Sequence, residues 1–63
     1  MCESNAYLFK EGKEEILLKD VSTIKPEDDH KWFLTNIFGE QKTIIGKIKE
    51  MNFLEHKIIF EEK

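Results

Sequence analysis

The sequence predicts a small all-β domain, a barrel or sandwich of the SH3 or Sm type with six to seven short strands. Short segments rich in β-branched and aromatic residues recur at regular spacing, as is typical of small barrels. The three glycines and the single proline lie between these segments. No segment keeps the 3.6-residue helical period for about ten residues without meeting one of them.

The first half of the chain alternates between apolar segments and turn residues. The expected strands along the whole chain are residues 6–9, 15–18, 21–25, 31–35, 42–45, 47–51 and 57–61. Glu11 and Gly12 separate the first two segments and predict a hairpin turn. Lys19 and Asp20 separate the second segment from the third, which is rich in β-branched residues.

The second half begins after a turn cluster at residues 26–30. There a proline fixes φ and aspartates bond to their own backbone, so we expect the chain to reverse before the fourth strand. Gly39 predicts another turn. Gly46 lies where a strand bulges or bends sharply. Residues 47–51 alternate charged and apolar side chains, the pattern of a half-buried strand.

A helical interpretation rests on two features of the sequence. Residues 11–19 contain many good helix formers, and Ile44 and Ile48 have helical i, i+4 spacing. Neither pattern extends far enough to form a helix of ordinary length, so the all-β prediction is preferred.

The chain of 63 residues is expected to form one domain, residues 1–63. A domain of this size buries only about 60% of the surface that its unfolded chain exposes, so small folds usually need additional stabilisation. One cysteine forms no internal disulfide and no zinc site of several thiolates. We therefore expect an economical core, self-association or both, and favour a homodimer.

The sequence also limits the cellular location and the kind of partner. The N-terminus lacks the basic and apolar regions of a secretory signal, and the apolar runs are far shorter than a membrane span of about 20 residues. An unpaired cysteine then fits a reducing cytoplasm. The net charge is −3 and all ten basic residues are lysine. The absence of arginine disfavours nucleic-acid recognition, although an RNA-binding barrel that stacks bases on its aromatic residues remains the alternative.

Cys2 is the strongest candidate for a metal ligand. Removal of Met1 would leave an α-amine, with a pKa of about 7.7–8.0, and a thiol of about 8.5 on one residue. Nitrogen and thiolate sulfur form a five-membered chelate ring, and two such residues from a pair of chains supply two nitrogens and two sulfurs. Square-planar nitrogen and sulfur donors suit Ni(II) or Cu(II). A terminal cysteine without a role is the competing interpretation.

Two histidines complete the set of candidate ligands. His56 lies in a predicted turn, and neutral imidazole is a good ligand for nickel, copper and zinc. An exposed loop histidine is the commoner case. His30 follows Asp28 and Asp29, but Lys31 would repel a cation, so a solvated turn is favoured there.

Catalysis finds little support in the sequence. A nucleophilic Cys2 would need a positioned base and an orienting third group, and no motif places either histidine beside it. The three glycines are too far apart to form a phosphate-binding loop. We therefore expect a binding protein and not an enzyme.

Four segments together resemble a known family. They are MCE at residues 1–3, LTNIFGE at 34–40, GKIKE at 46–50 and LEHKII at 54–59. In order and spacing they are similar to the CooT family, small nickel-binding accessory proteins of carbon monoxide dehydrogenase maturation. The resemblance implies a compact β-structure, a dimer, and Ni(II) binding by the cysteine after the initiator methionine, which is Cys2 here. It also implies a client, carbon monoxide dehydrogenase or another nickel enzyme.

Overall fold

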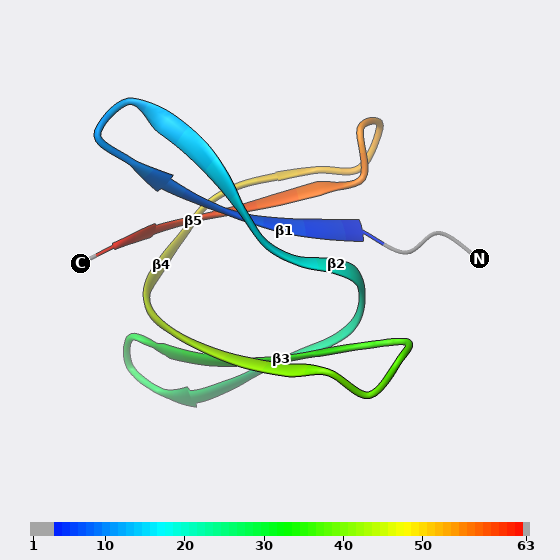
Figure 1. Ribbon diagram of the computed structural model, residues 1–63. Coiled ribbons are helices and arrows are strands. Elements are labelled where there is room, and N and C mark those ends of the chain that lie inside the picture. The colour runs from blue at the N-terminus through cyan, green and yellow to red at the C-terminus, as the bar shows by residue number, and fades with distance from the viewer. Residues whose placement is uncertain (1–3, 63) are drawn as a thin grey trace.

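The protein is a closed barrel of five strands (Figure 1). The computed structural model describes residues 4–62. The strands are β1 (Ser4–Lys10), β2 (Lys13–Asp28), β3 (Lys31–Asn36), β4 (Gln41–Asn52) and β5 (Lys57–Glu62). Consecutive strands pair antiparallel, and β1 pairs with β5 in parallel to close the barrel. The described residues include no helix long and apolar enough to cross a membrane. The all-β barrel prediction is confirmed.

The number of strands is five, slightly fewer than predicted, because two pairs of expected strands are continuous. Residues 15–18 and 21–25 both belong to β2, which bends at Asp20, where φ is 55°. Residues 42–45 and 47–51 both belong to β4, which bends at Gly46. At each bend the long strand stops pairing with one neighbour and begins to pair with the other. The break expected at Lys19 and Asp20 is therefore a bend within one strand, and the bend expected at Gly46 likewise redirects its strand without ending it.

Gly46 allows a close approach between β4 and β5. A Cβ atom at this position would clash with the backbone carbonyl of Glu61. The backbone N–H of Gly46 donates to the carbonyl of His30 at 2.7 Å, and its own carbonyl accepts from Trp32 Nε1 at 3.1 Å. The sharp bend predicted at this glycine is confirmed, and the packing explains why no side chain fits there.

The turn predicted at residues 26–30 is shorter than expected. Strand β2 continues through Asp28, so only Asp29 and His30 form the turn. Pro26 lies opposite Trp32, next to an irregularity in the β2–β3 register. Proline lacks an N–H for the ladder and is usually confined to sheet edges and irregularities of this kind.

Each strand contributes one side chain to the buried core. The core residues are Ala6, Val21, Leu34, Ile44 and Phe60. Trp32 covers this cluster, with its ring 6.0 Å from the ring of Phe60. The barrel therefore has a small core to which every strand is anchored.

A second apolar cluster lies on the outer face of β1 and β5. Ile59 is only 4% exposed, yet it alternates with the core residue Phe60 and so faces the other side of the sheet. Its neighbour across the sheet is Tyr7, and the Lys57 ammonium lies 5.0 Å from the centre of the Tyr7 ring. Lys57 donates to Glu14 at 2.9 Å, and this hydrogen bond raises the pKa of Lys57 above its usual range. The Lys57 ammonium thus lies over the Tyr7 ring while it bonds to Glu14.

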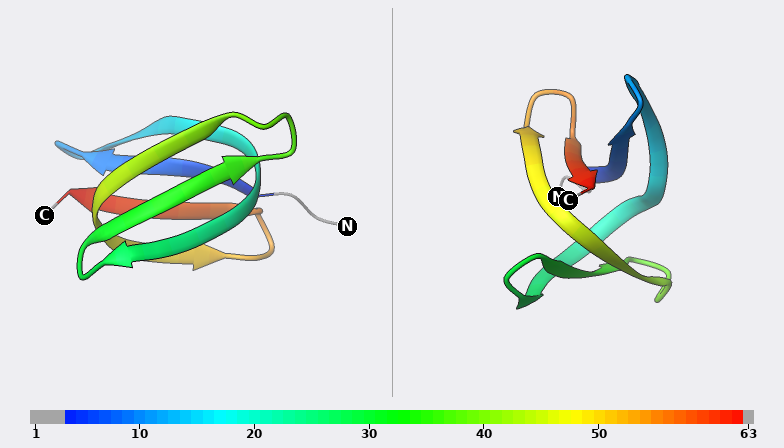
Figure 2. Two further views of the ribbon diagram at one scale, coloured as in Figure 1. Left: turned by 90° about the horizontal axis from the view of Figure 1, so that it is seen from below. Right: turned by 90° about the vertical axis from the view of Figure 1, so that its left-hand side faces the viewer.

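The two ends of the barrel carry different parts of the chain (Figure 2). One end holds the start of β1, the β3–β4 turn and the β4–β5 turn, with the start of β1 between the two turns. We call this the N-terminal end. The opposite end holds the β1–β2 turn, the β2–β3 turn and the end of β5.

Candidate functional site

The predicted metal ligand Cys2 lies outside the described residues. The first described residue, Ser4, begins β1 at the N-terminal end of the barrel (Figure 1). The described residues at that end are those that follow Cys2 most closely along the chain and those of the two neighbouring turns.

His56 is at this end, in the β4–β5 turn. Its side chain is exposed and its φ is 56°, a left-handed conformation that histidine adopts more readily than most residues. Its backbone carbonyl accepts a hydrogen bond of 2.8 Å from the N–H of Asn5. The parallel pairing of β1 with β5 therefore brings the first residues of β1 beside His56, although about fifty residues separate them along the chain.

Further hydrogen bonds join the start of β1 to the rest of this end. The Oδ1 atom of Asn5 accepts from the N–H of Asp20 at 3.0 Å. The carbonyl of Asp20 in turn accepts from the N–H of Ile37 at 3.0 Å. Asn5 thus connects the β4–β5 turn, the bend of β2 and the β3–β4 turn. Nothing in the sequence pattern indicated this role for Asn5.

Asparagine side chains hold both turns in place. Asn36 is 3% exposed, and its Oδ1 atom accepts from the N–H groups of Phe38 at 3.0 Å and Glu40 at 2.8 Å. Its Nδ2 atom donates to the Glu40 carboxylate at 2.7 Å. In the other turn, Asn52 Oδ1 accepts from the N–H of Glu55 at 3.0 Å. Each turn therefore has a side-chain brace in addition to its backbone hydrogen bonds.

The tips of the two turns are apolar. Ile37 and Phe38 are 51% and 72% exposed, and Phe53 and Leu54 are 75% and 94% exposed. We call these four residues the two-turn surface. This surface was not predicted from the sequence, although the pattern asparagine–apolar–apolar at residues 36–38 and again at 52–54 was a usable signal.

The described residues do not form a metal site by themselves. Among residues 4–62, no three histidine, cysteine, aspartate or glutamate side chains converge on a position where they would hold a metal ion. A metal site that uses His56 therefore needs a ligand from outside this part of the chain.

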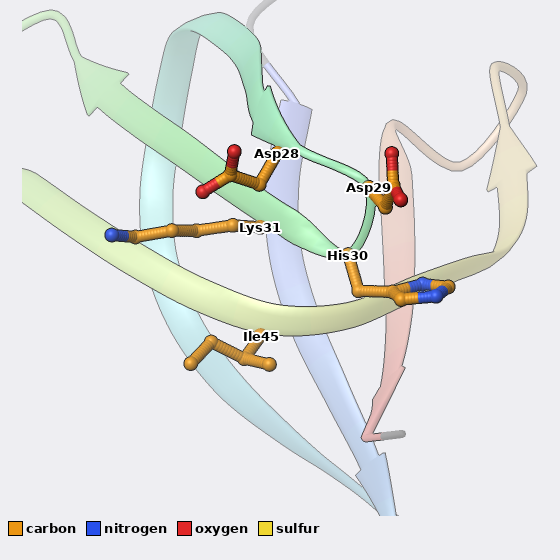
Figure 3. A pocket seen from close by; sticks show the side chains of 5 residues that line it. All are labelled: Asp28, Asp29, His30, Lys31 and Ile45. Atoms are coloured by element: carbon orange, nitrogen blue, oxygen red, sulfur yellow. The ribbon is translucent and has the colours of Figure 1, made fainter.

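His30 lies at the opposite end, in a shallow depression lined by Asp28, Asp29, His30, Lys31 and Ile45. Figure 3 shows the Asp28 carboxylate extending to the same side as Lys31, whereas the His30 imidazole points to the other side. These side chains do not converge, which agrees with the interpretation of this segment as a solvated turn.

Comparisons with known proteins bear on this arrangement. The family model described as CO dehydrogenase accessory protein CooT matches residues 1–61. An uncharacterized protein of Methanocaldococcus jannaschii is 31% identical over 61 residues, which cover 97% of this chain and 98% of the relative. A crystal structure assigned as CooT from Carboxydothermus hydrogenoformans superposes with a TM-score of 0.90 at 35% identity, covering 98% of both chains.

Proposed function

Because this chain belongs to the CooT family of carbon monoxide dehydrogenase accessory proteins, we propose that it binds Ni(II) through Cys2 and assists nickel delivery. The client is carbon monoxide dehydrogenase or another nickel enzyme. The work takes place in the cytoplasm. In this role the chain binds and releases its metal and catalyses no reaction.

The chemistry of Cys2 supports nickel as the ligand. After removal of Met1, the α-amine and thiol of one residue both lose their protons close to neutral pH, and the neighbouring ammonium favours the thiolate. The resulting nitrogen and sulfur donors suit square-planar Ni(II). Since binding displaces protons, nickel affinity is expected to rise with pH.

The single structural observation that carries the proposal is the hydrogen bond from Asn5 to His56. Cys2 precedes Asn5 by three residues, and this bond holds the start of β1 against the turn that carries His56. We propose His56 as an additional nickel ligand, or as a transient one during transfer. No other histidine or cysteine of residues 4–62 lies at this end.

We further propose that the protein acts as a homodimer. One chain offers a single thiolate, whereas two chains offer two nitrogens and two sulfurs, which complete a square-planar set. A site shared between copies also agrees with the lack of a complete ligand set within residues 4–62 of one chain.

A nickel titration of the purified protein tests this function. Cys2→Ser is expected to weaken nickel binding at least tenfold and to abolish the sulfur-to-nickel charge-transfer absorption. His56→Asn removes the imidazole while keeping a residue that tolerates the left-handed conformation, so a smaller loss is expected. His30→Asn is the matched control and leaves binding unchanged. Unaltered binding by Cys2→Ser would remove Cys2 from the site.

The RNA-binding alternative finds less support in the structure. The rings of Tyr7 and Phe9 are each covered by a lysine ammonium, at 5.0 Å and 4.8 Å from the ring centres. Phe38 and Phe53 are exposed, but each shares its turn with a glutamate, which repels a polyanion. The observations therefore favour the metal-binding function.

A further inference from the structure

The pairing of β1 with β2 is irregular at the point where β1 begins. Between the pairs Ser4–Val21 and Ala6–Leu18, β1 contributes one residue, Asn5, whereas β2 contributes two. This mismatch is a β-bulge, and the extra residue of a bulge has no partner in the ladder. The start of β1 therefore needs another bond to stay in register with β2.

The side chain of Asn5 supplies this bond. Asp20 is the second of the two residues of β2 at the bulge, and its φ of 55° turns its N–H out of the regular ladder. That N–H donates to the Oδ1 atom of Asn5 at 3.0 Å. Asn5 is half-buried, so the bond is partly shielded from competing water. A side chain of β1 thus takes the place of the missing ladder bond.

The main chain of Asn5 bonds on the opposite side, toward β5. Its N–H donates to the carbonyl of His56 at 2.8 Å, and His56 has a φ of 56°. Asn5 therefore joins the start of β1 to both neighbouring strands, through its side chain on one side and its backbone on the other. Both residues that it contacts have a left-handed backbone, at the bend of β2 and at the end of the β4–β5 turn.

Covalent geometry limits how far the proposed ligand Cys2 can lie from this anchor. Cys2 precedes Asn5 by three residues, and each residue spans at most about 3.6 Å. The two α-carbons are therefore within about 11 Å of each other in any conformation of the chain. A ligand tethered this close to a second ligand acts at a high effective concentration, which falls when the tether point is released.

We propose that Asn5 is a positioning residue of the nickel site. Its bond to Asp20 keeps the start of β1, and Cys2 with it, within reach of His56, so that both ligands bind the same ion. The inference rests on the proposed function, because Cys2 as a nickel ligand is its premise. Both bonds of Asn5 lie within one chain, so the inference applies equally to a single chain and to each copy of a homodimer.

Nickel titration of the full-length chain tests the role of Asn5. Asn5→Ala is expected to weaken nickel binding roughly fivefold, a typical coupling for residues of one hydrogen-bond network. If Asn5 acts by bringing Cys2 to His56, Asn5→Ala and His56→Asn cause similar losses, and the double variant binds no more weakly than either single variant. The sulfur-to-nickel absorption persists in all three variants, because Cys2 is intact.

Two further variants separate positioning from a general structural effect. Asn5→Asp keeps an oxygen acceptor for the Asp20 N–H and is expected to restore nearly wild-type affinity. Ser22→Ala is the matched control, since it removes another side-chain hydrogen bond of β2, the one of 3.1 Å to the Thr35 carbonyl. Its nickel affinity is expected to equal that of the wild type. Asn5→Gln displaces the acceptor by one methylene group and replaces Asn5→Ala if that variant does not fold.

The outcomes distinguish this inference from the proposed function. Wild-type affinity in Asn5→Ala together with lost binding in Cys2→Ser overturns the inference and leaves the function standing. Losses that multiply in the double variant also overturn it, because Asn5 and His56 then act independently. A loss that Asn5→Asp does not recover overturns it as well. Unaltered binding by Cys2→Ser removes the proposed function, and this inference fails with it.

Discussion

The two ends of the barrel differ in the chemistry of their turns. At the opposite end, the turns consist of Glu11 with Gly12 and of Asp29 with His30, all of them exposed. At the N-terminal end, the turn tips are the apolar residues of the two-turn surface. Both ends reverse the same kind of strand in the same barrel, so strand reversal alone does not require apolar tips.

The two kinds of turn differ in what explains their side chains. The residues of the polar turns suit the turn backbone and water, so strand reversal is enough to explain them. The apolar turns expose apolar side chains to water, and an asparagine side chain braces each of them, the buried Asn36 in one turn and the less buried Asn52 in the other. Exposed apolar side chains gathered in this way are typical of interaction sites.

The largest expected effect comes from removing the bend that places two turns at one end. Gly46→Ala puts a Cβ atom against the Glu61 carbonyl, so β4 and β5 must separate or β4 must straighten. The free energy of unfolding is expected to fall by about 3 kcal/mol. Urea denaturation followed by tryptophan fluorescence measures this change, since Trp32 bonds to the Gly46 carbonyl.

The neighbouring residue provides the control for this variant. Ile45→Ala removes an exposed side chain and is expected to change the stability by less than about 0.5 kcal/mol. A loss below about 1 kcal/mol for Gly46→Ala would show that the barrel tolerates a side chain at the bend.

An intermediate effect distinguishes the two apolar turns. Asn36→Ala leaves the N–H groups of Phe38 and Glu40 without their acceptor beside a buried site, and a loss of about 2–3 kcal/mol is expected. Asn52→Ala removes one exposed hydrogen bond, and a loss of about 1 kcal/mol or less is expected. Thermal unfolding of both variants provides the comparison. Equal losses of unfolding free energy in the two variants would show that the burial of Asn36 does not strengthen its contribution to stability.

The smallest expected effect concerns Lys57, which follows the β4–β5 turn. Glu14→Gln weakens the hydrogen bond that raises the pKa of Lys57, so this pKa is expected to fall toward its usual 10.5. The pKa of Lys57 is raised in the folded state. The pair therefore stabilises the wild type at pH values below 10.5, and this stabilisation is lost as the pH rises through the raised pKa. NMR titration of the Lys57 side chain measures the shift, and an unaltered midpoint would contradict the pairing.

The fold was predictable because local patterns determined it. The apolar segments, the hairpin signal at Glu11 and Gly12, and the bend at Gly46 all follow from short-range chemistry. The strand count was too high because a bend and a strand end carry the same sequence signal. Only pairing with distant strands shows that β2 passes through Asp20 without a break.

The site was predictable only in part. The chemistry of Cys2 and His56 selected them as candidates. Cys2 lies outside the described residues, and the approach of Asn5 to His56 depends on the pairing of β1 with β5, which no local pattern predicts. The two-turn surface escaped the sequence analysis because an apolar residue at a turn tip and one in a strand look alike until exposure is known. Resemblance to a family supplied a function that composition alone did not.

The parallel pairing of the first and last strands also sets an order of events during synthesis. Residues 5–9 of β1 pair with residues 57–61 of β5, so β1 leaves the ribosome well before its partner strand is available. Contacts this distant in sequence form slowly, because closing a long loop costs entropy before any contact repays it. The Asn5–His56 bond and the neighbourhood it creates therefore form only after β5 has been synthesised. A nascent chain that ends before β5 lacks this neighbourhood, so nickel loading at the proposed site has to follow the pairing of β1 with β5.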